Sequence, residues 1–192
     1  MKTILAVLTA AALATAAQAD IFSDNFDTEN GGNEALNYNG LTQWTVSNGT
    51  IDLIGNGGTY DFLPGNGLYI DLDGTSNDAG DLMSLSIFLT PGSYTLSYDL
   101  AGSQRSGSAV DTVDVTFGGA PTVNHVLPYT QGFTNYSINL NVLVAGNVTI
   151  TFQDSGTDNQ GALLDNVRVV PTPGAAALAG VGLLASARRR RV

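Results

Sequence analysis

The sequence predicts an all-β protein, an antiparallel β-sandwich (jelly roll) of about nine to eleven strands. Apolar and polar side chains alternate in short runs between Asp20 and Val170, as expected for sheets with one buried and one solvated face. Turn signals such as Asn48-Gly49 and Asp73-Gly74 separate the runs, and helical periodicity is almost absent. Residues 20–170 are enough for one substantial core.

The clearest run is Ser93–Leu100, in which Tyr94, Leu96 and Tyr98 share one face with Leu100 and are expected to be buried. The same pattern recurs along the chain. The predicted strands are Gln43–Ser47, Thr50–Ile54, Leu68–Leu72, Leu82–Leu89, Ser93–Leu100, Val110–Phe117, Thr134–Val142, Asn147–Phe152 and Ala162–Val170.

Charge is distributed unevenly. All 17 acidic residues lie between Asp20 and Asp165, whereas only Arg105 and Arg168 of the seven basic residues lie outside the extreme termini, which leaves the middle of the chain at −15. Such a surface repels phosphate backbones, so nucleic-acid binding is excluded. The absence of cysteine excludes a disulfide scaffold, a thiol nucleophile and a thiolate-bound metal.

The first 19 residues have the pattern of a secretory signal peptide, with a helical apolar stretch after Lys2. The small residues Ala17 and Ala19 form an A-x-A cleavage site, so the exported chain is expected to begin at Asp20. A retained membrane anchor is the alternative, but the apolar run falls short of the ~20 residues that span a bilayer.

The last segment, residues 171–192, combines three parts in a fixed order. Pro171-Thr172-Pro173 is followed by a short apolar, helix-permissive run, and Arg188, Arg189, Arg190 and Arg191 close the chain. The arginines would hold this end on the cytoplasmic side of a membrane. The arrangement resembles the PEP-CTERM sorting signal, with Thr172 in place of the family's glutamate. The resemblance implies processing by an exosortase-type enzyme at the inner membrane and delivery to the cell surface or extracellular matrix. A permanent single-pass tail and a shed tail remain alternatives.

The middle of the chain resembles the galactose-binding-like jelly rolls found in secreted bacterial anchor proteins and in carbohydrate-binding modules. The stretches that carry the resemblance include Gln43–Val46, Tyr69–Gly74, Gly92–Gly102 and Gly161–Val169. In those jelly rolls an acid after the first strand and an acid in the last strand hold a structural calcium ion. Asp27 and Asp165 match these positions, and carboxylate oxygens suit Ca²⁺. The predicted domains are therefore residues 1–19, 20–170 and 171–192.

Catalytic motifs are weak. The single histidine, His125, has no neighbouring Gly-x-Ser-x-Gly elbow, so a serine triad is not expected. Two carboxylates could hydrolyse a glycosidic bond, but the many acids here also fit a solvated acidic surface. An acidic stretch at Asp71–Asp81 lacks the closing glutamate of an EF-hand loop. We expect a protein that is not an enzyme.

Sugar binding requires exposed aromatic rings beside polar groups. Tyr60 and Tyr129 are the aromatic candidates in predicted loops, and Arg105 is a base that could bind an acidic polymer. Trp44, the only tryptophan, is a further candidate, although its alternation with Val46 favours a core position. The sequence thus predicts an exported, non-catalytic sandwich with a structural or adhesive role in exopolysaccharide or biofilm matrix. A secreted glycan hydrolase and a ligand-free structural protein are the alternatives.

Overall fold

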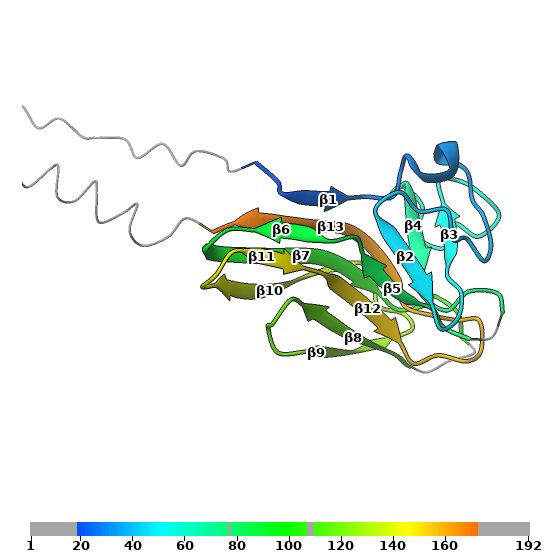
Figure 1. Cartoon of the computed structure of the whole chain (residues 1–192). Coiled ribbons are helices and arrows are strands. Elements are labelled where there is room, and N and C mark those ends of the chain that lie inside the picture. The colour runs from blue at the N-terminus through cyan, green and yellow to red at the C-terminus, as the bar shows by residue number, and fades with distance from the viewer. Residues whose placement is uncertain (1–18, 77, 107–109, 173–192) are drawn as a thin grey trace, which may run out of the picture.

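A computed structural model describes residues 19–76, 78–106 and 110–172, which form an all-β sandwich of antiparallel sheets (Figure 1). Several predicted features lie outside the described residues: Ala17 of the signal peptide, Pro173, the apolar C-terminal run and the four terminal arginines. Ala19 is described and precedes the first strand. No helix in the described ranges is long and apolar enough to cross a bilayer.

One sheet has the strand order β10-β7-β13-β4-β3, and β1 joins it along β13. All of its pairings are antiparallel. Its strands are β1 (Phe22–Asp24), β3 (Asp52–Gly55), β4 (Leu68–Asp71), β7 (Gly92–Ala101), β10 (Thr134–Val142) and β13 (Leu163–Pro171).

The facing sheet has the order β2-β5-β12-β8-β9, and a short pair, β11-β6, continues from it. Its strands are β2 (Trp44–Ser47), β5 (Asp81–Ser84), β12 (Ile150–Asp154), β8 (Val110–Phe117) and β9 (Val123–Pro128), and the short pair is β6 (Ile87–Leu89) and β11 (Gly146–Val148). A short 3₁₀ helix, η1 (Glu29–Gly32), precedes β2.

Two segments that the alternation predicts as single strands are each divided in two. Leu82 and Ser84 are buried on β5, but the next buried residues are Ile87 and Leu89 on β6, so the inward-facing positions change from even to odd. A strand has a period of two and cannot bury both sets without a break. The partner segment is divided to match, since β6 pairs with β11 and β5 pairs with β12.

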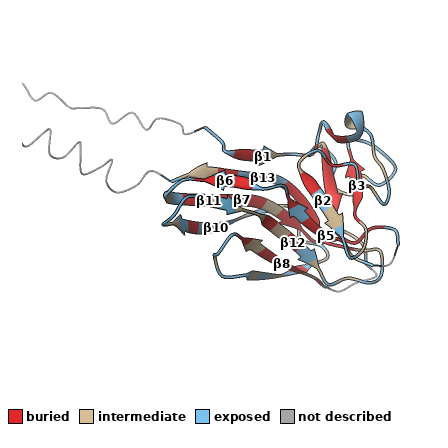
Figure 2. Ribbon diagram, viewed as in Figure 1, coloured by how far each residue is buried: buried red, intermediate tan, exposed pale blue. Residues whose placement is uncertain are grey.

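The core lies between the sheets (Figure 2), and β7, β8 and β12 alternate more and less buried residues as predicted, whereas β3 and β4 are buried at every position. Tyr98 packs edge-on against Phe152, with ring centroids 5.2 Å apart, and Phe152 contacts Trp44 at 6.0 Å. These aromatic side chains link strands of both sheets and fix the spacing between them.

The last strand, β13, lies at the centre of the first sheet. It pairs with β7 on one side; on the other, Leu163 and Leu164 pair with β4, while Val167–Val169 pair with β1. Between these pairings the register shifts, and Asn166 adopts a positive φ of 50°. The side chain of Asp165 therefore lies at a gap in the ladder rather than within a continuous pairing.

Candidate functional site

A small pocket lies among the loops at the end of the sandwich where β13 begins. Its volume is about 170 Å³, smaller than the ~300–1,000 Å³ of pockets for drug-sized ligands, which suits a single ring. We call it the loop pocket. It is lined by Leu36, Asp52, Ile54, Tyr60, Phe62, Asp71, Thr75, Arg105 and Asn159.

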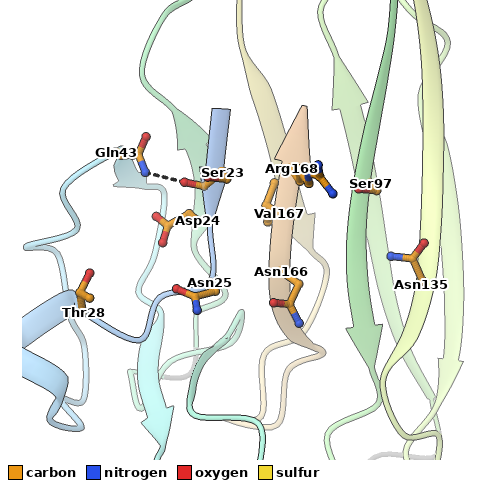
Figure 3. A pocket seen from close by; sticks show the side chains of 10 residues that line it. All are labelled: Ser23, Asp24, Asn25, Thr28, Gln43, Ser97, Asn135, Asn166, Val167 and Arg168. Carbon is orange, nitrogen blue, oxygen red and sulfur yellow. Dashed lines mark hydrogen bonds between the residues drawn. The ribbon is translucent and has the colours of Figure 1, made fainter. Parts of the chain in front are cut away.

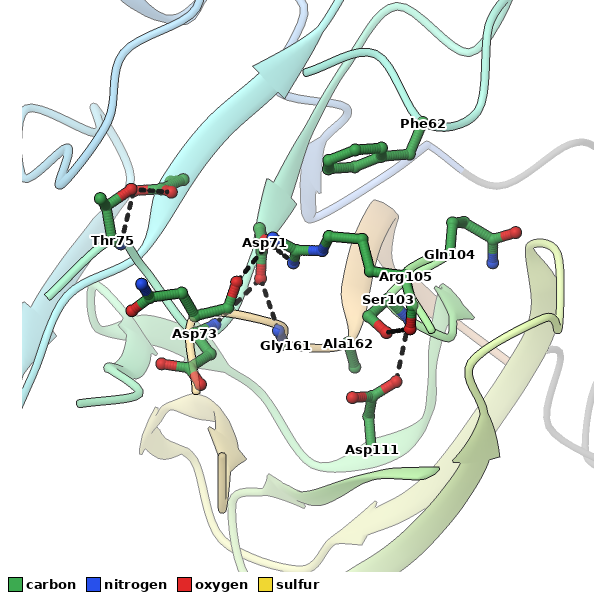
Figure 4. A network of polar contacts seen from close by, with 12 residues as sticks. Phe62, Asp71, Asp73, Thr75, Ser103, Gln104, Arg105, Asp111, Gly161 and Ala162 are labelled. Atoms are coloured by element: carbon green, nitrogen blue, oxygen red, sulfur yellow. Dashed lines mark hydrogen bonds and ion pairs between the residues drawn. The ribbon is translucent and has the colours of Figure 1, made fainter. Parts of the chain in front are cut away.

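Arg105 organises this pocket (Figure 4). One guanidinium nitrogen donates to the carboxylate of Asp71, which is 1% exposed, and the other donates to the carbonyl of Asn159 at 2.6 Å. The guanidinium also lies over the ring of Phe62, 4.9 Å from its centroid. Three loops that are distant in sequence therefore meet on one cation. Arg105, predicted as a base that could bind an acidic polymer, has its charge already paired with Asp71.

Burial raises the pKa of Asp71 well above its usual value, and Arg105 opposes this rise. The backbone amides of Asp73 and Gly161 donate to the other oxygen of Asp71, at 3.2 and 3.0 Å. Both oxygens are thus occupied. Asp71 faces Asp52 across the β3–β4 pair, and Asp52 accepts bonds from Thr75 and from the amide of Asn37. Neither carboxylate is free to transfer a proton without breaking these contacts.

Tyr60 is held in place by Glu34. The Glu34 carboxylate accepts hydrogen bonds from the amides of Gly55, Thr59 and Tyr60 at 2.8–3.2 Å, which fixes the turn in front of the pocket. Tyr60 is 40% exposed, and its ring centroid lies 6.5 Å from that of Phe62. The pocket therefore presents a pre-positioned aromatic ring beside a second one and several polar groups.

Aspartates surround the loop at residues 154–162, next to the pocket. Asp73 is fully buried, and one of its oxygens accepts from the amide of Asp158 at 3.0 Å while the other, among the described residues, has no partner. Asp154 accepts from the amides of Gly156 and Ala162, both at 2.8 Å. These bonds close the loop onto the end of β12.

A larger groove lies over β1, β13, β7 and β10, with a volume of about 600 Å³ (Figure 3). We call it the amide groove. No aromatic ring from the described part of the chain lines it. Two of its amides already bond within the protein, since Asn135 and Asn166 both donate to Asp99. Its lining residues are Ser23, Asp24, Asn25, Thr28, Gln43, Ser97, Asn135, Asn166, Val167 and Arg168.

Asp27 and Asp165 come close to each other at the gap beside β13. The pKa of Asp165 is raised to about 7, chiefly by burial; the amide of Asn166 acts to lower it, and the charges of Asp27, Asp99 and Asp24 contribute to the rise. Asp27 accepts from the amide of Leu68 at 2.9 Å. Within the described ranges, no group of three or more acidic or histidine side chains is arranged to hold a metal ion.

The other predicted ligand residues have different roles. Trp44 is 3% exposed and donates to Asp24, so it is a core residue and not a platform. Tyr129 is partly buried after β9, and its carbonyl accepts from the amide of Gln104, but it does not line the loop pocket. His125 bonds to the hydroxyl of Tyr98 at 2.8 Å, and burial lowers its pKa.

Sequence reasoning missed Phe62 and the pairing of Asp71. Phe62 lies in a loop without periodicity, so no pattern marks it as part of a site. The Asp71–Arg105 pair joins residues 34 positions apart in sequence, and the spacing of the two gives no hint of it.

No family model matches the sequence, and no curated protein matches it. Among solved structures, the chain is similar to the CBM22-1 xylan-binding domain from Paenibacillus barcinonensis Xyn10C, with a TM-score of 0.52, 14% identity, and coverage of 84% of this chain and 99% of that chain. TmCBM61 in complex with β-1,4-galactotriose gives 0.49 at 15% identity, covering 68% and 90%. A family 35 carbohydrate binding module from Clostridium thermocellum gives 0.42 at 17%, covering 66% and 90%. The fold is that of the carbohydrate-binding-module jelly rolls, as the sequence predicted.

The partly buried carboxyl group of Asp154 makes a pH dependence of stability testable. Burial raises its pKa to about 6, so the native state binds this proton more tightly than the unfolded chain does. The contribution of Asp154 is therefore lost as pH rises from about 4 to about 6, by roughly 3 kcal/mol. Urea unfolding should be measured at pH 4 and at pH 7. The free energy of unfolding of Asp154→Asn, relative to that of the wild type, should be higher at pH 7 than at pH 4 by about this amount.

Asp114→Asn removes one carboxyl group from the same sheet, where Asp114 bonds to the side chain of Asn124, and serves as the matched control. If the difference in unfolding free energy between wild type and Asp154→Asn is the same at both pH values, the assignment of a raised pKa to Asp154 is wrong.

Proposed function

We propose that this protein is an exported, non-catalytic sandwich that binds glycan in the loop pocket and has a structural or adhesive role in an exopolysaccharide or biofilm matrix. The observation that carries the proposal is the exposed ring of Tyr60 beside Phe62, with Asp52, Asn159 and Arg105 around it. Aromatic rings bind the C–H faces of sugars, and polar groups at the rim fix their hydroxyls. A protein with the same fold is described as a xylan-binding domain, which is compatible with a glycan as the ligand class.

The geometry favours binding over hydrolysis. Glycosidases need two accessible carboxyl groups on either side of the scissile bond. Asp71 is 1% exposed and bonded to Arg105, and Asp52 is 6% exposed and bonded to Thr75. The two glutamates serve as backbone acceptors, Glu29 for Thr42 and Glu34 for the turn before Tyr60. The alternative function, a glycan hydrolase, would be supported only if the protein released products from a glycan that it binds.

We further propose that the chain reaches its destination by the route that its terminal segments indicate. The leader would direct export, and the C-terminal segment would hold the protein at the inner membrane until an exosortase-type enzyme processes it. Thr172 is bonded to Ser93 of β7, and the apolar run of the sequence begins two residues after it.

A structural calcium ion at Asp27 and Asp165 is the proposed cofactor. The donors there are hard oxygens of the kind that Ca²⁺ takes, and the charges of Asp27, Asp99 and Asp24 all act on the buried Asp165. Only two of the predicted ligands are side-chain carboxylates, so backbone carbonyls, Asn25 or water would have to complete the shell. The ion would neutralise Asp165 at the gap in the β13 ladder.

Glycan binding at the loop pocket is tested by substitution of its platform. A glycan array identifies a ligand for the purified full chain, and Tyr60→Ala should weaken binding to that ligand at least about tenfold, equivalent to about 1.4 kcal/mol. Tyr129→Ala is the matched control, because Tyr129 lies outside the pocket, and it should bind as the wild type does. An array without any bound glycan, or equal affinities for Tyr60→Ala and wild type, would overturn the proposal.

Calcium binding is tested by thermal unfolding of the full chain in excess EGTA and in millimolar calcium. A ligand that binds only the native state raises its stability, so calcium should raise the midpoint by several degrees. Asp165→Asn should abolish this rise, and Asp114→Asn should retain it. A wild-type midpoint that does not change with calcium rejects the site.

A further inference from the structure

Three large apolar side chains are exposed together at one end of the sandwich. Phe88 on β6 is 62% exposed, and Leu143 and Val144, in the turn between β10 and β11, are 80% and 81% exposed. We call these three residues the apolar tip. Large apolar groups that gather on a surface usually mark a contact with another molecule or with lipid.

The strand pairings bring these residues to the same end. Val142, the last residue of β10, pairs with Gly92, the first residue of β7. Leu89 of β6 pairs with Gly146 of β11. The turn after β6 and the turn after β10 therefore lie beside each other, at the end of the sandwich toward which β13 runs (Figure 1).

The chain leaves the sandwich at this same end. The amide of Thr172 donates to the carbonyl of Ser93 at 2.7 Å, and its hydroxyl lies 2.9 Å from that of Thr95. Only Pro173 separates Thr172 from the apolar run of residues 174–187. A residue spans at most about 3.6 Å, so that run must begin within about 7 Å of Thr172, near the start of β7.

The two segments that carry the apolar tip contain no charged residue, whereas an ion pair of Asp20 with Arg168 lies beside the last residues of β13. Residues 82–98 and 126–153 contain no Asp, Glu, Lys or Arg, although the middle of the chain carries a net charge of −15. The buried aspartates lie at the other end, since β13 begins with Leu163 paired to Asp71 and ends with Pro171 paired to Tyr94. Nine residues of strand separate the two ends by about 30 Å.

We propose that the apolar tip rests on the lipid bilayer while the C-terminal run is inserted in it. This inference depends on the proposed membrane-bound stage, and not on glycan binding. The short connection leaves the domain no room to stand away from the membrane, and the end that must touch it is the one that carries the apolar tip. The contact fixes the orientation of the domain, so that the loop pocket faces away from the lipid.

The test places a tryptophan at the apolar tip of the full chain. The chain is then bound to vesicles of phosphatidylethanolamine and phosphatidylglycerol, and its fluorescence is compared between vesicles with and without brominated acyl chains. Bromine quenches tryptophan fluorescence only at close approach. Phe88→Trp should be quenched at least twofold more than Val126→Trp, the matched control, because Val126 is 60% exposed on β9 and pairs with Thr112 away from the tip. The buried Trp44 of the wild-type chain gives the background.

Leu143→Trp is a second probe in an exposed turn, and it decides the test if Phe88→Trp does not fold. Vesicle flotation measures the membrane-bound stage separately. A chain that does not float with the vesicles overturns the inference. So does a floating chain in which the tip probes and Val126→Trp are quenched equally, and this second result leaves the glycan proposal intact.

Discussion

The ion pair between Arg105 and Asp71 is the interaction on which the loop end of the sandwich depends. Asp71 ends β4, Arg105 follows β7, and Asn159 belongs to the loop before β13, so one guanidinium joins three loops beneath the ring of Phe62. An aspartate that is 1% exposed is costly to bury without a partner. The pair holds the Arg105 guanidinium against Phe62, while Glu34 fixes the turn that carries Tyr60, so both rings of the loop pocket have defined positions.

The central strand β13 gives the molecule its polarity. Its first residues lie beside Asp71 and the loop pocket, and its last residues lie beside β7, where the chain leaves the fold. Carboxylates gather at the first end and exposed apolar side chains at the second. A protein held at a membrane by its C-terminal segment would thus present its ligand pocket outward. The gap in the ladder at Asp165 interrupts this strand where calcium binding is proposed.

Alternation predicts most of the fold because a sheet with one buried face imposes a period of two. Tyr94, Leu96 and Tyr98 are buried as the pattern requires. The pattern fails where the buried positions change from even-numbered to odd-numbered residues. This change lies between Ser84 and Ile87, in a segment predicted as one strand that the structure divides into β5 and β6. The site is less predictable. Tyr60 and Arg105 were predicted separately, but no local signal joins them or points to Phe62, because loop contacts depend on tertiary structure.

A double-mutant cycle at the central ion pair tests this account most directly. Unfolding free energies are measured in urea at pH 7 for wild type, Arg105→Gln, Asp71→Asn and the double variant. Each single change should cost about 3 kcal/mol, because it leaves a buried polar group without its partner, and the double variant should cost at least about 1 kcal/mol less than the two together. Costs that add to within about 0.5 kcal/mol would show that the two residues act independently, and the loop pocket would then need another explanation.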